Sequence, residues 1–465
     1  MKKFIIPVLI LISGISLGQN YEIQVEMKSA AAKKIKLAYH YTGNVFIKDS
    51  VQLNKSGFGV FKGDSLLPQG LYKIFLDEKN HFDFLIGADQ QFSLSNDSFH
   101  AENLRINGAV ETEEFVRYMI FLKNLQNRGA EIREKLKTAS GDEKNKLQEE
   151  MAEMTPVLHE YWKSVEKKYP GTFLAKFLMA NLVPTPDIST LPQEIQHNDS
   201  LLLLARFYYQ KEHFWDHFDY TDERFLYTPL LKPKLETWFT KVLYQDYDSI
   251  KPHVFQFIED VRPNKRIFQY VTSWFLNSAV NSNIMGMDAL MVDLAKTYYL
   301  SGEAFWASEK TMDNIRENVM FAENNLIGKT APDLNLESVD GEYFRLHQVK
   351  AKYTVVLIYE PECSHCSVFV PDFHKAVYQS FKNKGLQVYA IYSANHKDEW
   401  VDFLTKHNLY DWINVWDENH VSRFKILYDG RKTPGVYVLD ENKTIVAKNI
   451  SVEQLKRFME SELNK

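Results

Sequence analysis

The sequence predicts a multidomain chain with an antiparallel β-sandwich first, an all-α region next and an α/β domain last. Three successive patterns of apolar residues predict this order. Apolar and polar residues alternate with period two in 19–108, residues 109–322 follow helical spacing, and 323–465 alternate between strand-like and helix-like segments. A chain of 465 residues is long enough for roughly two to four domains, so each pattern can form a domain of its own.

Residues 1–18 have the composition of a secretory signal peptide. Lys2 and Lys3 are followed by an apolar stretch at 4–17, and small residues just before Gln19 suit cleavage there. The stretch is shorter than the roughly 20 residues that cross a bilayer as a helix, although an uncleaved anchor is the alternative. We therefore expect an exported, periplasmic protein that is not inserted in the membrane after signal removal.

The first predicted domain, 19–108, consists of short segments in which apolar residues alternate with polar ones. Turn sequences such as Thr42-Gly43-Asn44 and Pro68-Gln69-Gly70 separate these segments. Short strands at this spacing are typical of an antiparallel sandwich. The expected strands include 21–25, 34–39, 71–76 and 82–86. The domain shows no catalytic constellation, so we interpret it as a binding or packing module.

The second predicted domain, 109–322, has helical spacing interrupted by prolines, which predicts helices separated by loops. His213 and His217 are spaced i, i+4, as on a metal-binding helix face. They lack the glutamate of an HExxH motif, so aromatic packing is favoured over a metal site.

The formal net charge of −6 and the scattered lysines and arginines argue against nucleic acid as a partner.

The third predicted domain, 323–465, contains a strand at 385–392, a helix at 398–407 and a hairpin at 435–447. A capping-box sequence at 451–454 begins the last helix. This order is typical of an α/β domain that ends in an antiparallel edge.

Cys363 and Cys366 are the only cysteines in the chain and form the motif Cys-Ser-His-Cys. They follow the apolar run 355–359 and precede a helical pattern. At a helix start, unpaired N–H groups and the helix dipole favour a thiolate, and the second thiol is within reach to close a disulfide. A metal site would need a second pair of ligands, and a structural disulfide of so short a ring would contribute little stability. The pair therefore predicts redox chemistry without a cofactor.

The order of elements, the dithiol and Thr433-Pro434 before the hairpin together resemble the thioredoxin superfamily, most closely its exported TlpA/ResA-like branch. Residues 328–334 and Asp340-Gly341 resemble the N-terminal hairpin of that branch, and the resemblance covers about 140 residues. The two preceding domains are similar to uncharacterised N-terminal regions of exported thioredoxin-like proteins from Gram-negative bacteria. Those regions imply no functional residues here.

The resemblance implies a thiol-disulfide oxidoreductase in which Cys363 attacks, Cys366 resolves and the two form a Cys363–Cys366 disulfide. It also implies a cis peptide bond at Thr433–Pro434, opposite the dithiol, where an extended substrate segment can pair. Protein disulfides of the cell envelope would be the substrates. A membrane thiol-disulfide electron donor would keep the dithiol reduced, so we expect a reductant.

The sequence departs from the thioredoxin pattern around the dithiol. Leu357 stands where thioredoxins have a buried aspartate, and Tyr359 replaces the usual tryptophan and joins Thr433 and Pro434 as a predicted substrate contact. Glu360 is a candidate proton acceptor in place of that aspartate. His365 is a candidate for stabilising the thiolate, or simply an exposed histidine.

Two rival interpretations use the same residues differently. A peroxiredoxin has threonine three residues before its reactive cysteine, where this chain has Glu360. The stronger rival is an envelope binding or assembly protein with a redox-inactive thioredoxin-like domain, because about 330 residues carry no redox feature. The reduction potential and turnover of the dithiol separate this rival from the oxidoreductase.

Overall fold

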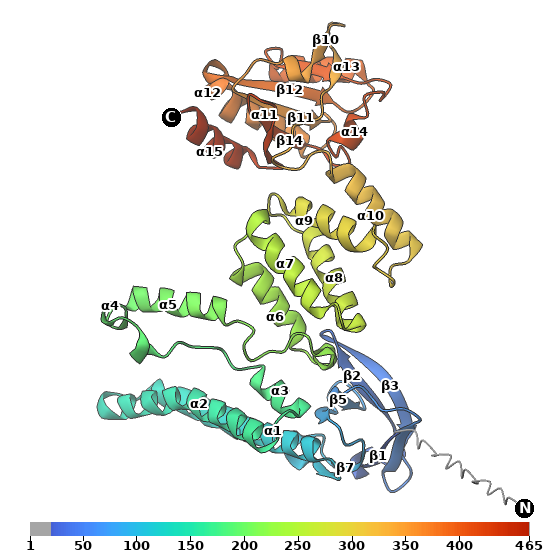
Figure 1. Ribbon diagram of the computed structural model, residues 1–465, viewed down its shortest axis with the longest axis vertical. Coiled ribbons are helices and arrows are strands. Elements are labelled where there is room, and N and C mark those ends of the chain that lie inside the picture. The colour runs from blue at the N-terminus through green and yellow to red at the C-terminus, as the bar shows by residue number, and fades with distance from the viewer. Residues whose placement is uncertain (1–19, 465) are drawn as a thin grey trace, which may run out of the picture. The chain divides into compact units, whose positions relative to one another are not determined.

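A computed structural model describes residues 20–464 of the chain (Figure 1). The predicted signal peptide, residues 1–18, lies outside the described residues. The rest forms two compact units, one ending at Leu243 and the other beginning at Tyr244. The division falls inside 109–322, the segment for which helical spacing predicts a single domain.

The N-terminal part of the first unit contains two four-stranded sheets, in agreement with the period-two pattern. The first has the order β4-β1-β7-β8 and the second the order β3-β2-β5-β6. The strands of the first sheet are β1 (Tyr21–Glu26), β4 (Phe58–Gly63), β7 (Gln91–Ser95) and β8 (Arg105–Asn107). Those of the second are β2 (Lys34–Tyr41), β3 (Asn44–Gln52), β5 (Gly70–Phe75) and β6 (His81–Ile86).

Side chains from both sheets share one buried core. Ile23 and Phe61 from the first sheet belong to the same apolar cluster as Ile35, Ile74 and Phe84 from the second. This core contains the residues that the alternating pattern directs to one face of each strand. The expectation of purely antiparallel strands is wrong, however, because β1 pairs with β7 in parallel.

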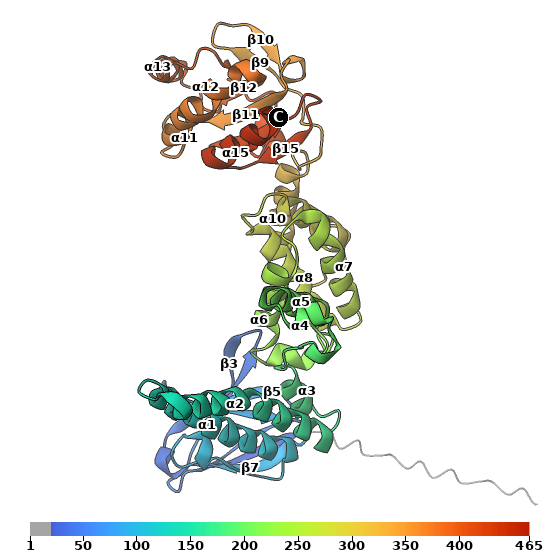
Figure 2. The ribbon, with the colours of Figure 1, turned by 90° about the vertical axis from the view of Figure 1, so that its left-hand side faces the viewer.

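Helices follow the sheets in the first unit. They are α1 (Val110–Leu136), α2 (Gly141–Lys168), α3 (Phe173–Met179), α4 (Gln193–Gln196), α5 (Asp199–Glu212) and α6 (Leu231–Thr237). The long helices α1 and α2 lie side by side, and α1 also contacts β6 (Figure 2). The buried Glu111 carboxylate accepts hydrogen bonds from the backbone N–H groups of Ala88 at 3.0 Å and Leu174 at 2.9 Å. It thus joins α1 to the sheets and to α3.

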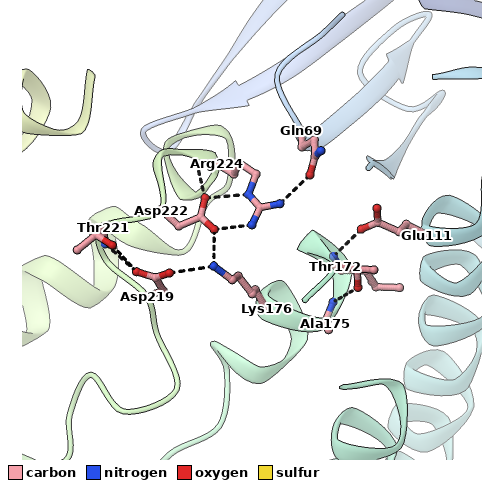
Figure 3. A network of polar contacts seen from close by, with 10 residues as sticks. Gln69, Glu111, Thr172, Ala175, Lys176, Asp219, Thr221, Asp222 and Arg224 are labelled. Carbon is pink, nitrogen blue, oxygen red and sulfur yellow. Dashed lines mark hydrogen bonds and ion pairs between the residues drawn. The ribbon is translucent and has the colours of Figure 1, made fainter. Parts of the chain in front are cut away.

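A network of charged side chains connects α3 to the segment before α6 (Figure 3). The Lys176 ammonium is 2.9 Å from the carboxylates of both Asp219 and Asp222. The Arg224 guanidinium forms two hydrogen bonds with Asp222, at 2.8 and 2.6 Å, and donates to Gln69 Oε1 at 2.8 Å. Since Gln69 lies just before β5, the network ties the helical segment to the sheet.

The second unit begins with four helices, α7 (Tyr247–Val261), α8 (Lys265–Val280), α9 (Met287–Leu294) and α10 (Glu309–Ala322). Three of them have a side-chain cap at the N-terminus: Asp246 caps α7, Asn264 caps α8 and Ser308 caps α10. Among the helices in residues 20–464, none is both long and apolar enough to cross a membrane.

A seven-stranded sheet with the order β10-β9-β13-β12-β11-β14-β15 forms the rest of the second unit. Its strands are β9 (Asn335–Ser338), β10 (Tyr343–Arg345), β11 (Tyr353–Tyr359), β12 (Leu386–Tyr392), β13 (Ile413–Trp416), β14 (Gly435–Leu439) and β15 (Ile445–Lys448). Strands β11, β12 and β13 are parallel, whereas β14 and β15 are antiparallel. This confirms the predicted α/β domain with an antiparallel edge.

Helices cover both faces of this sheet (Figure 1). They are α11 (Cys366–Phe373), α12 (Gln379–Phe381), α13 (Lys397–His407), α14 (Phe424–Leu427) and α15 (Val452–Leu463). In β11, Val355, Leu357 and Tyr359 belong to one buried core, and Val356 and Ile358 to another on the opposite face. Burial on both faces explains why 355–359 is a continuous apolar run. The capping box predicted at the start of α15 is present.

Candidate dithiol site

The two cysteines lie between β11 and α11, at the strand-to-helix turn that the sequence predicts. The backbone N–H of Cys363 donates to the carbonyl of Glu360 at 3.1 Å, which closes a tight turn directly after β11. Cys366, rather than Cys363, is the first residue of α11. Both are free thiols; Cys363 is partly exposed and Cys366 is fully buried. Only Cys363 can therefore meet a protein substrate directly.

Several hydrogen bonds favour the thiolate of Cys363. A hydrogen bond from the Thr433 side chain does most to lower the pKa of Cys363. The backbone N–H groups of Cys366 and His365 lower that pKa further, and partial burial opposes them. As a neutral thiol, Cys363 donates to the Thr433 carbonyl oxygen at 3.5 Å. The imidazole of His365 is exposed, so its predicted effect on the thiolate stays a prediction.

Cys366 lies in the opposite environment. Burial raises the pKa of Cys366 from the ordinary value of 9.0 to about 11, although the backbone N–H of Glu360 donates to its sulfur and lowers the pKa in part. Leu357, at the position of the thioredoxin aspartate, is fully buried and apolar. The pKa shifts of the two thiols thus differ in direction because hydrogen bonds outweigh burial at Cys363, whereas burial outweighs hydrogen bonds at Cys366.

The Glu360 side chain points to the end of the neighbouring strand. Its carboxylate accepts a hydrogen bond from Ser393 Oγ at 2.7 Å, and Ser393 comes directly after β12. Ser393 is not among the residues that the sequence predicts for the site. The parallel register, in which Tyr359 pairs with Tyr392, places the residues that follow β11 and β12 side by side. Recognising both strands and their shared carboxyl edge would have identified it.

Tyr359 does not occupy the predicted substrate contact. The side chain is fully buried, and Tyr359 Oη accepts a hydrogen bond from Trp400 Nε1 at 3.0 Å. Its ring also packs against Phe403, with centroids 5.6 Å apart. A side chain without exposed surface cannot contact a docked protein. Tyr359 therefore packs in the same buried core as Cys366, and its predicted role as a substrate contact is wrong.

Thr433 and Pro434 lie beside Cys363 and have the cis peptide bond that the resemblance implies. Pro434 precedes β14, which pairs with β11 and so brings the two loops together (Figure 1). A shallow hollow of about 470 Å³ adjoins them. It is lined by Ser364, His365, Val368, Phe369, Asp372, Pro434 and Val452. The site thus combines a reactive thiol with an exposed, partly apolar surface.

Comparisons with known proteins agree with this geometry. The model of the AhpC/TSA family matches residues 327–448. A domain of a possible thiol-disulfide isomerase from Cytophaga hutchinsonii is 38% identical, over 29% of this chain and 92% of that one, with a TM-score of 0.28. The C-terminal domain belongs to the thioredoxin superfamily.

Two further solved structures are similar to the chain. A conserved protein of unknown function from Bacteroides fragilis is 33% identical, over 29% of this chain and 98% of that one, with a TM-score of 0.26. A thioredoxin-like protein from Bacteroides caccae is 19% identical, over 60% of this chain and 98% of that one, with a TM-score of 0.47. The search of curated proteins returned no match.

Metal ligands do not gather in the thioredoxin-like domain or elsewhere in the described chain. No group of three or more His, Cys, Asp or Glu side chains between residues 20 and 464 could hold a metal ion. His213 Nδ1 instead lies 2.6 Å from Asp216 Oδ2, and its ring stacks on Tyr209.

Proposed function

We propose that this protein is a thiol-disulfide oxidoreductase in which Cys363 attacks and Cys366 resolves. The observation that carries the proposal is the contrast between the two thiols. The partly exposed Cys363 has a lowered pKa, and the buried Cys366 has a raised one. The thiolate is the nucleophile in disulfide exchange, so the first step falls to Cys363.

The proposed reaction has two exchange steps. The Cys363 thiolate attacks one sulfur of a substrate disulfide, which forms a mixed disulfide and releases the other substrate sulfur as a thiolate. Cys366 then loses its proton and attacks the Cys363 sulfur, which forms the Cys363–Cys366 disulfide and releases the second substrate thiolate. The substrate gains two electrons and, after protonation, two protons, and the protein dithiol loses them.

Glu360 is our candidate acceptor for the proton of Cys366. Its backbone N–H donates to the Cys366 sulfur, which places the residue directly beside the thiol. Leu357 cannot take the proton, so another group near the turn has to. Glu360→Gln should therefore slow the resolving step and leave formation of the mixed disulfide unchanged.

We further propose that the protein is periplasmic and acts as a reductant of envelope protein disulfides. The TlpA/ResA-like resemblance supports the role of reductant, and the signal-like sequence at residues 1–18 supports the periplasmic location. The dithiol would then depend on a membrane thiol-disulfide electron donor. In growing cells we expect the two cysteines to be mostly reduced, and to become oxidised when that donor is deleted.

The test uses the purified mature protein and a disulfide-bonded polypeptide such as insulin. Cys363→Ser should abolish reduction, Cys366→Ser should accumulate mixed disulfides, and Ser367→Ala, an exposed residue that does not line the hollow, should retain the parent activity. Full turnover by Cys363→Ser would show that the mechanism is wrong. A very low reduction potential with no turnover would favour the rival, an envelope binding or assembly protein.

A further inference from the structure

The second unit has a long groove between its helices and the thioredoxin-like domain. Its volume is about 1390 Å³, above the range of about 300–1,000 Å³ typical of small-molecule sites. The helical wall comes from the loop between α8 and α9, from the start of α9 and from α10. The opposite wall comes from the loop before β14, from β15 and from α15. A groove of this size suits a polypeptide segment better than a small ligand.

The groove adjoins the hollow of the dithiol site. Phe369 and Pro434 line both this groove and the hollow beside Cys363. Thr433, whose carbonyl accepts from the Cys363 thiol, directly precedes Pro434. A polypeptide whose cysteine has reacted with Cys363 can therefore continue over Pro434 into the groove.

Hydrogen bonds and an ion pair within the second unit connect the two walls of the groove. The buried Lys448 ammonium of β15 lies 2.6 Å from Asp288 Oδ2 at the start of α9, and 2.5 Å from Asn325 Oδ1. Arg431 donates to Asn318 Oδ1 of α10 at 3.0 Å. Since a buried ammonium needs its partners, the helices are fixed beside the thioredoxin-like domain rather than loosely tethered.

The side chains along the groove define what it can bind. Ile284 and Met285, in the loop between α8 and α9, are exposed apolar residues on the helical wall. Both carboxylates of the groove are engaged, because Asp288 pairs with Lys448 and Asp429 with Arg431. Lys432 is exposed, and no ion pair is recorded for it within residues 20–464. The charge left to attract a ligand is therefore positive.

We propose that this groove binds the extended segment next to the reacting cysteine of a substrate protein. An apolar side chain of that segment contacts Ile284 and Met285, and an acidic side chain pairs with Lys432. The helices α8 to α10 thus select the substrate, and the dithiol carries out the exchange. This inference rests on the proposed function, because the segment is held only while its cysteine reacts with Cys363.

The experiment measures the first exchange step alone, in the mature Cys366→Ser protein. The probes carry a cysteine activated as a mixed disulfide with thionitrobenzoate, and attack by the Cys363 thiolate releases the coloured thionitrobenzoate anion. One probe is activated cysteine itself. The second is a ten-residue peptide with leucine and glutamate beside the cysteine, and the third has lysine in place of that glutamate.

Two groove variants are compared with two matched controls. Met285→Glu is matched by Met320→Glu on α10, because these methionines are 47% and 37% exposed and Met320 does not line the groove. Lys432→Glu is matched by Lys350→Glu, another exposed lysine away from the groove. We expect Met285→Glu to slow both peptides about fivefold, because it places a carboxylate at an apolar contact.

Lys432→Glu should slow the glutamate peptide about threefold and accelerate the lysine peptide, as expected for one exposed ion pair. Each peptide rate is divided by the rate at which the same variant reacts with activated cysteine, which removes any effect of the substitution on the Cys363 thiolate itself. Equal rates for all probes and variants, or equal losses in Met320→Glu and Lys350→Glu, would overturn the groove assignment and leave the proposed function intact. Unchanged release by a Cys363→Ser variant would instead refute the proposed function.

Discussion

The buried thiol of Cys366 should ionise about two pH units above an ordinary cysteine. Its pKa is raised from 9.0 to about 11, with burial as the main cause. At neutral pH this shift leaves about 100-fold less thiolate than a cysteine of ordinary pKa would have. The pKa of Cys363 moves the other way, so Cys363 should be alkylated more than 100-fold faster than Cys366 at pH 7.

The assay is alkylation with iodoacetamide between pH 6 and pH 11, followed by intact-mass spectrometry. Cys366 is measured in Cys363→Ser, which keeps the burial that raises its pKa, and Cys363 is measured in Cys366→Ser. In denaturant the two thiols should react alike, which separates the effect of the fold from the effect of sequence. The reasoning fails if folded Cys366 ionises at or below pH 9.

Two further predictions concern charged side chains within each of the two units. Lys448→Met should lower the free energy of unfolding of the second unit by about 2–3 kcal/mol, because it leaves the partly exposed Asp288 carboxylate and Asn325 without their buried partner. An unchanged free energy of unfolding in urea would contradict this. Burial raises the pKa of Asp222, but hydrogen bonds from Arg224 and Lys176 outweigh it and lower the pKa from 3.8 to about 2. Because the folded pKa is lowered, the carboxylate stabilises the first unit above pH 4, and this contribution is lost as the pH falls through 2. Asp222→Asn should therefore cost about 2 kcal/mol at pH 7 and about half as much at pH 3 in urea titrations, and an equal cost at both pH values would exclude this explanation.

The sequence predicted the class of each region because side-chain periodicity is local. Strand β11 is recognisable in the sequence as an apolar run, and the two cysteines that follow it indicate the site. The parallel pairing of β1 with β7 was not visible, because it depends on which distant strand completes the sheet. The division at Leu243 likewise follows from contacts between helices rather than from their periodicity.

Within the site, residue type locates the two thiols but does not show which side chains surround them. The prediction of Tyr359 as a substrate contact is wrong because the side chain has no exposed surface. Alternation along β11 instead directs Tyr359 to the same buried face as Val355 and Leu357. The groove was also beyond prediction, since Met285 and Lys432 line the same groove only through the packing of helices on the sheet.

The parallel pairing of β1 sets the order in which the first sheet can form. Strand β1 lies between β4 and β7, and its residue Glu22 pairs with Gln91, which is 69 residues later in the chain. Contacts between residues so far apart form slowly because a long loop has to close first. A chain that crosses a membrane from its N-terminus cannot complete this sheet until β7 has emerged. In the proposed export, the first strand after the predicted cleavage site would stay incompletely paired during passage, which is the unfolded condition that a narrow export channel requires.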